Sequence, residues 1–188
     1  LTNRARFKFS LGGATHEAVN DGQITVNFPG SISGSDRKSY LSVVSLECNT
    51  RSAGGLKRGF GEQETFSPTV FAQEIAELVG AMYAQQQTPL PVKHQDQELF
   101  VLSMHGSLFY VSAAYFSPRY MAYIQEGSYS GDDTFLWVRR SIHFDLKKVE
   151  DRGEALGFVW GLVSYISSGN ARVNIVSSAI HEASISVP

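Results

Sequence analysis

Residues 39–49 read Ser-Tyr-Leu-Ser-Val-Val-Ser-Leu-Glu-Cys-Asn, and this stretch decides the fold that the sequence predicts. Its apolar, β-branched centre is typical of a central strand that is covered on both faces. The strand ends near a carboxylate, Glu47, which a buried strand tolerates only where the charge meets a partner, a metal ion or water. We expect this strand, together with a long helix that begins at Ser67, to form the centre of the molecule.

The helix is the clearest local pattern in the chain. Ser67 followed by Pro68 is typical of an N-cap with proline in the first helical position. Apolar residues then recur at i, i+4, i+7, i+8 and i+11, which predicts one core-facing stripe: Phe71, Ile75, Leu78, Val79 and Met82. Glu74 and Glu77 flank this stripe, and the pattern predicts that they form the solvated edge of the helix.

The remaining elements are predicted from alternation, turn residues and caps. Before the central strand we expect a strand over 6–11, a helical turn over 15–20 and a strand over 23–28. After the first helix we expect a hairpin over 98–103 and 108–115, a short helix over 117–125, and a strand from 135 that extends towards 144. Asp151 and Glu154 predict a capping box for a second long helix, which ends at Gly169 and carries a broad apolar face: Ala155, Leu156, Val159, Trp160, Leu162, Val163 and Ile166.

The order of these elements predicts an α+β fold, with a mixed central β-sheet flanked by two long helices. The tail over 172–187 is either a closing strand or a loose end. With 188 residues the chain is long enough for one domain, 1–188. Because the first residue is not Met, we expect that domain to be part of a longer chain.

Composition excludes several classes of function. Sixteen Lys and Arg against eighteen Asp and Glu give a net charge of −2, which argues against a protein that coats phosphate backbones. No run approaches the ~18 apolar residues of a membrane span, so we expect no membrane. The single cysteine, Cys48, cannot form an internal disulfide, which favours a reducing, intracellular location, cytoplasmic or nuclear.

Chemistry-bearing residues follow the central strands. Asp21 precedes the strand over 23–28, and Glu47 and Asn49 stand at i and i+2 near the end of the next strand, so they share a face. An Asp before one strand, a Glu-x-Lys motif at the end of the next, then a helix and another strand, resembles the PD-(D/E)XK nuclease-like superfamily. Residues 99–108 and 135–146 also resemble, more diffusely, fungal domains of this type that accompany fungal-type protein kinases or stand alone.

The resemblance implies a restriction-endonuclease-like core and a metal-dependent site. Asp21 and Glu47 would be ligands of Mg²⁺ or Mn²⁺, with Gln73 or Glu74 as further ligands. Asn49 replaces the lysine of the motif and has no positive charge, so Lys57 is the candidate for a displaced lysine. The resemblance therefore leaves two functions open. One is a degenerate nuclease-fold domain that acts as a binding or regulatory module in a larger fungal protein; the alternative is a metal-dependent DNA endonuclease or phosphodiesterase.

Other candidate residues have a structural and a functional interpretation. Lys57-Arg58, in a glycine-rich stretch, and Arg139-Arg140, beside Trp137, are candidate nucleic-acid contacts, but an ordinary loop and an ordinary charged strand end explain them equally. Cys48 is a candidate nucleophile, but a lone cysteine on a buried strand predicts a core position. His105 is a candidate ligand or base, but the hairpin predicts a surface turn position. If the aromatic residues between 109 and 123 are exposed, they indicate a protein partner or a homo-oligomer.

Overall fold

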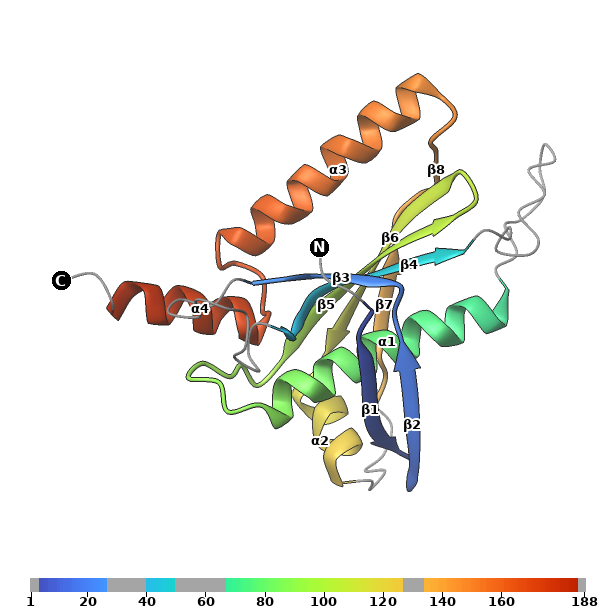
Figure 1. Ribbon diagram of the computed structural model, residues 1–188. Helices are drawn as coiled ribbons and strands as arrows, with labels where there is room; N and C mark the ends of the chain where they lie inside the picture. Colours follow the sequence, from blue (N-terminus) through green and yellow to red (C-terminus); the bar gives the residue numbers. More distant parts are fainter. Residues whose placement is uncertain (1–3, 27–39, 50–66, 127–133, 186–188) are drawn as a thin grey trace.

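The computed structural model describes residues 4–26, 40–49, 67–126 and 134–185. It is an α+β structure in which helices cover both faces of a mixed sheet (Figure 1). Along the sheet the strand order is β3 (Gly22–Thr25), β4 (Ser42–Asn49), β5 (Gln97–His105), β6 (Leu108–Phe116) and β7 (Trp137–Arg140), and β8 (Phe144–Asp145) also pairs with β6. Only β4 and β5 run parallel, and the other neighbours are antiparallel. The predicted mixed sheet is confirmed.

The parallel pair is joined through α1 (Pro68–Gln87), which lies along one face of the sheet (Figure 1). Ser67 is its N-cap and Pro68 its first residue, as the sequence predicts. Leu78, Val79 and Met82 are buried against β5 in the main core cluster, whereas Phe71 at the start of the helix is 42% exposed. The strand β4 has Val43 and Val44 in its covered centre, at 4% and 2% exposure.

An N-terminal hairpin packs on the outer side of α1. Its strands are β1 (Arg6–Leu11) and β2 (Ala14–Val19), joined by two glycines with positive φ, Gly12 and Gly13. The predicted helical turn over 15–20 is wrong, because these residues pair with β1 in antiparallel register and bury Phe7, Phe9 and Ala18 against α1. At Gly80 a Cβ atom would overlap that of Phe7, so the hairpin approaches the helix as closely as a glycine permits.

The hairpin β5–β6 and the helix that follows it match the prediction. The two strands pair over nine residues each, and α2 (Pro118–Glu126) starts directly after them. The strand expected from 135 towards 144 is instead two short strands, β7 and β8, which pair with different ends of β6. The break lies between Arg140 and Phe144, where the backbone N–H of Ser141 donates to the carbonyl of Val111.

The second long helix, α3 (Val149–Ser167), runs past the face of the sheet opposite α1 (Figure 1). Its N-cap is Lys148 rather than Asp151, which lies in the first turn and accepts a hydrogen bond from the backbone N–H of Asp145. The prediction of a broad packed apolar face is wrong. Only Ala155 and Ile166 are buried, so α3 contacts the body of the protein mainly towards its two ends.

The tail is neither a strand nor a loose end but a helix, α4 (Asn174–Ile185). It is fixed by buried side chains rather than by the pattern of its own sequence. The amide of Gln85 on α1 donates to the carbonyl of Ser42 and accepts from the backbone N–H of Ile175, and Asn174 accepts from the backbone N–H of His94. Ile175 and Val176 enter the second core cluster, on the same face of the sheet as Val44 and Phe100.

Candidate functional site

A row of polar side chains crosses the sheet on the face that α1 covers. In the ladder Glu47 lies opposite Ser103, Ser103 opposite Tyr110, and Ser112 opposite Arg140. Because side chains alternate along a strand, all five point to the same face as Leu99 and Val101, towards α1. Glu47, Ser103, Tyr110 and Ser112 are buried, with at most 3% exposure. A dry polar layer therefore separates the N-terminal half of α1 from the sheet.

Glu74 of α1 is the centre of this layer. One of its carboxylate oxygens accepts from the hydroxyls of Tyr110 and of Ser103 (2.8 Å). The other accepts from Ser112 Oγ at 3.1 Å and from Arg140 Nη2 at 3.0 Å. The Arg140 side chain is 15% exposed and its guanidinium lies 5.2 Å from the ring centroids of Phe71 and Tyr110. Glu74 is thus a fully partnered structural carboxylate, and its predicted position on the solvated edge of the helix is wrong.

Glu77, one helical turn further, meets Glu47 in buried space. Their exposed fractions are 0% and 3%, and among the described residues neither carboxyl oxygen of Glu77 has a hydrogen-bond partner. Burial and the charge of Glu47 raise the pKa of Glu77 to about 10, and burial also raises the pKa of Glu47. Glu77 therefore holds a proton near neutral pH. The prediction that places Glu77 on the solvated edge is also wrong.

Two buried histidines pack against the ring of Tyr110 in the polar layer. His105 is 2% exposed and stacks on the ring of Tyr110 with a centroid separation of 5.7 Å, and His143 meets the same ring edge-on at 4.9 Å. Burial is the main cause that lowers the pKa of His105, so the imidazole is neutral at physiological pH. The predicted surface turn position of His105 is wrong, because the two-residue turn starts one residue later, at Gly106.

Asp21 lies next to this layer, and its carboxylate is already engaged. Oδ1 accepts from the guanidinium of Arg4 at 2.8 Å, and Oδ2 accepts from the backbone N–H of Cys48 at 3.0 Å. The Cys48 side chain itself is exposed, which corrects the predicted core position. The negative charge of Asp21 is close enough to raise the pKa of Glu47. The structure therefore brings Asp21 and Glu47 into one neighbourhood, but it directs them to different partners.

The other predicted site residues do not gather in one place. In the backbone ladder Asn49 pairs with His105 at the end of β4. Lys57 and Arg58 lie outside the described residues. Arg140 turns inward to Glu74, whereas Arg139 is exposed on the opposite face of the sheet beside the exposed ring of Trp137.

Protein-family models, curated proteins and solved structures give no match. The nuclease-like relationship therefore remains an expectation. Within the described ranges, no helix has the length and apolar character to cross a membrane.

A divalent metal ion needs several oxygen or nitrogen ligands that converge on one point. Across the described part of the chain there is no group of three or more His, Cys, Asp or Glu side chains arranged to hold one. Glu47 and Glu77 supply two carboxyls, but Glu74 is occupied by four donors and Asp21 by two. The residues described here do not fit a metal centre of the implied kind.

Sequence reasoning missed the partners that make the polar layer: Glu77, Tyr110, Ser112 and His143. One signal was present in the helix. Glu74, Leu78 and Met82 follow each other at i, i+4 and i+8, which places them on one face. A glutamate on a buried stripe needs donors across the interface, and the strand residues facing it supply hydroxyls and a guanidinium.

Proposed function

We propose that this chain is a non-catalytic binding module with a nuclease-like arrangement of strands and helix, acting within a larger fungal protein as the resemblance implies. The observation that carries the proposal is the position of Glu47. Its carboxyl group is buried beside Glu77 of α1, whereas the carboxylate of Asp21 is directed to Arg4 and to the backbone N–H of Cys48. Two carboxylates that hold one metal ion must face the same accessible space, and these contacts direct the two groups apart.

The neighbouring groups support the same conclusion. Asp21 is paired with Arg4 and with a backbone N–H, and Asn49 has no charge to place beside a phosphate. The only guanidinium that points into the polar layer, among the described residues, is that of Arg140, and it is paired with Glu74. The polar layer therefore has the character of a structural network that fixes α1 on the sheet.

Binding is supported by the outer surface of α3. Residues 155–168 contain no charged side chain, although most of them face solvent. Leu156 and Trp160, one helical turn apart, are 71% and 74% exposed. A helix that faces water normally carries a charged face, and exposed large apolar side chains that include a tryptophan are typical of a protein interface.

The pattern of small residues on α3 supports a helical partner. Gly153, Gly157 and Gly161 recur at every fourth position, and a Cβ atom at any of them would meet nothing within 4 Å. Glycine in an exposed helix costs about 1 kcal/mol relative to alanine, and close approach of another backbone is a reason to keep it. Gly157 lies near the middle of α3. If the α3 helices of two copies cross there in antiparallel orientation, Gly153 of one copy lies opposite Gly161 of the other. A second copy of this chain is therefore the first candidate partner.

The experiment that tests the proposal measures Mn²⁺-dependent cleavage of labelled DNA by the intact protein and by Glu47→Gln. We expect no cleavage by either protein and no rise in melting temperature on adding Mn²⁺. Cleavage by the wild type that disappears in the variant would overturn the proposal. It would establish the alternative, a metal-dependent endonuclease or phosphodiesterase.

A further inference from the structure

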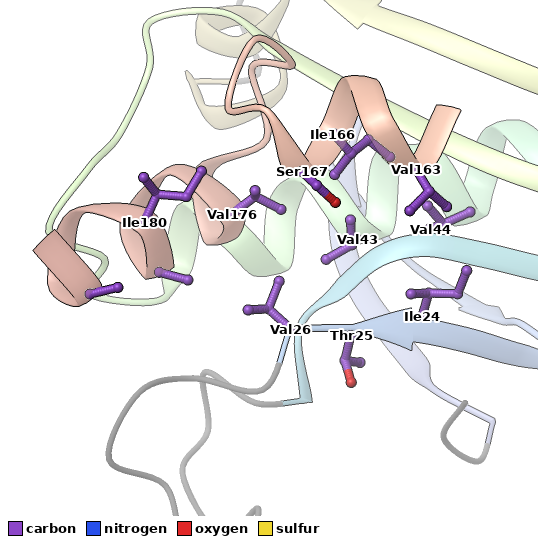
Figure 2. A pocket seen from close by; sticks show the side chains of 12 residues that line it. Ile24, Thr25, Val26, Val43, Val44, Val163, Ile166, Ser167, Val176 and Ile180 are labelled. Carbon is purple, nitrogen blue, oxygen red and sulfur yellow. The ribbon is translucent and has the colours of Figure 1, made fainter. Parts of the chain in front are cut away.

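A separate apolar cavity lies on the face of the sheet opposite the polar layer. Figure 2 shows it between the strand pair β3–β4, the C-terminal end of α3 and helix α4. Its volume is about 400 Å³. The sheet contributes Ile24 and Val44, α3 contributes Val163 and Ile166, and α4 contributes Val176 and Ile180.

The walls of the cavity are part of the second core cluster and are therefore held in place. Val43, Val44, Ile166 and Val176 are at most 6% exposed and pack on further buried residues of that cluster. At the rim, Val163 and Ile180 are 40% and 44% exposed, so the cavity opens to solvent between α3 and α4. The cavity exists because α3 runs past the sheet instead of lying on it.

The lining determines which molecules fit. None of the residues that line the cavity is charged, and the hydroxyl that points into it is that of Ser167, whereas the Thr25 side chain points away from α3 and α4 (Figure 2). A charged ligand group would be buried there without a partner, at a large cost in free energy. Water is also poorly held, because an ordered water needs two to four polar partners. The volume lies within the roughly 300–1,000 Å³ of ordinary ligand pockets.

We propose that this cavity binds a small neutral molecule with an alkyl or acyl chain that ends in an uncharged polar group. The chain replaces water against the valine and isoleucine walls, and burial of apolar surface supplies the affinity. The neutral head group lies beside the hydroxyl of Ser167, which points into the cavity. This site lies at the C-terminal end of α3, whereas Leu156 and Trp160 of the proposed protein-binding surface do not line it.

The test uses 1-decanol as the probe and sodium decanoate as its charged counterpart. Binding is followed by two-dimensional NMR of the intact protein with labelled Ile and Val methyl groups. We expect 1-decanol to shift the methyl signals of Ile24, Val44, Val176 and Ile180 in a saturable way. We expect decanoate to bind at least about tenfold more weakly, because its carboxylate gains no partner in the cavity.

A matched pair of variants on α4 locates the site. Ala183 lines the cavity and is exposed at its rim, whereas the neighbouring Ser184 is exposed and does not line it. Ala183→Trp should fill the opening and weaken 1-decanol binding at least about tenfold, and Ser184→Trp should leave it unchanged. Unsaturable shifts, equal affinity of both variants, or tighter binding of decanoate than of 1-decanol would each overturn the proposal.

Discussion

Glu47 at the end of β4 and Glu77 in α1 hold their two carboxyl groups together in a space that excludes solvent. The pair has one consequence for the whole molecule. Because the pKa of Glu77 is raised to about 10, its carboxyl group stays protonated between the helix and the central strand near neutral pH. The stability of the fold therefore depends on pH through this buried group.

The first prediction concerns the charge of Glu77. Its pKa is raised from 4.5 to about 10, so the folded state holds a proton that the unfolded state releases above pH 4.5. The stabilising effect of that proton is complete below pH 4.5 and is lost as pH rises towards 10. Glu77→Gln should stabilise the protein by on the order of 1–3 kcal/mol at pH 8 and by much less at pH 5.

Melting temperatures of the wild type and Glu77→Gln between pH 5 and pH 9 check this prediction. Glu154→Gln, which removes an exposed carboxylate from α3, is the matched control and should follow the wild type. Parallel curves for the wild type and Glu77→Gln over the whole range would show that the pKa of Glu77 is not raised in the folded state.

The second prediction concerns the ion pair of Arg140 with Glu74. The Glu74 side chain is 1% exposed, so Arg140→Met leaves a buried carboxylate without its cation. Removal of one partner of a buried pair costs about 3–5 kcal/mol. Urea unfolding should show that loss for Arg140→Met, and a partial recovery when Glu74→Gln is added to the same chain. Strictly additive losses in the double variant would contradict a direct coupling between the two side chains.

The third prediction compares two glycines in helices. Gly80→Ala should destabilise the protein by about 1–3 kcal/mol, because its Cβ collides with Phe7 and pushes the β1–β2 hairpin off α1. Gly157→Ala should instead stabilise the monomer by up to about 1 kcal/mol, because nothing lies near its Cβ and alanine favours the helix. Chemical denaturation of both variants measures these changes in the free energy of unfolding. Equal changes would mean that the β1–β2 hairpin does not pack closely against Gly80.

The fourth prediction concerns the outer surface of α3. Trp160 is 74% exposed, so Trp160→Glu should change the unfolding free energy by no more than about 0.5 kcal/mol. The same change should abolish self-association measured by analytical ultracentrifugation. Gln125→Glu, at an exposed position of α2, adds the same charge elsewhere and should leave self-association intact. A wild-type chain that stays monomeric at every concentration would exclude a second copy as the partner.

The sequence predicts the elements whose patterns are local. The strand around Val43 and Val44, the first helix and the β5–β6 hairpin follow from alternation, capping and turn residues, and the structure confirms them. The helix α4 was not predictable in this way. Its serine-rich, β-branched sequence favours a strand, and it is helical because Ile175 and Val176 pack into a core built by distant residues.

The candidate site was harder to predict, because its contacts join elements that lie far apart in the sequence. The sequence pattern predicts that Glu74 faces solvent, because its partners Tyr110 and Arg140 lie 36 and 66 residues away along the chain. The sequence pattern predicts that His105 is a turn residue, whereas in the structure the turn starts at Gly106. A difference of one residue in register moves a strand side chain from solvent to the core.

The reactivity of the exposed Cys48 thiol depends on the charge of the groups around it. It is the one thiol in the sequence, so any disulfide that it forms must reach outside the chain. Partial burial, and then the charges of Asp21 and Glu47, raise the pKa of this thiol. Only the thiolate reacts with alkylating reagents, so its labelling rate reports the negative charge held by the neighbouring carboxyls. The alkylation rate of this one thiol, measured as a function of pH, can therefore follow the charge of Glu47 without altering that glutamate.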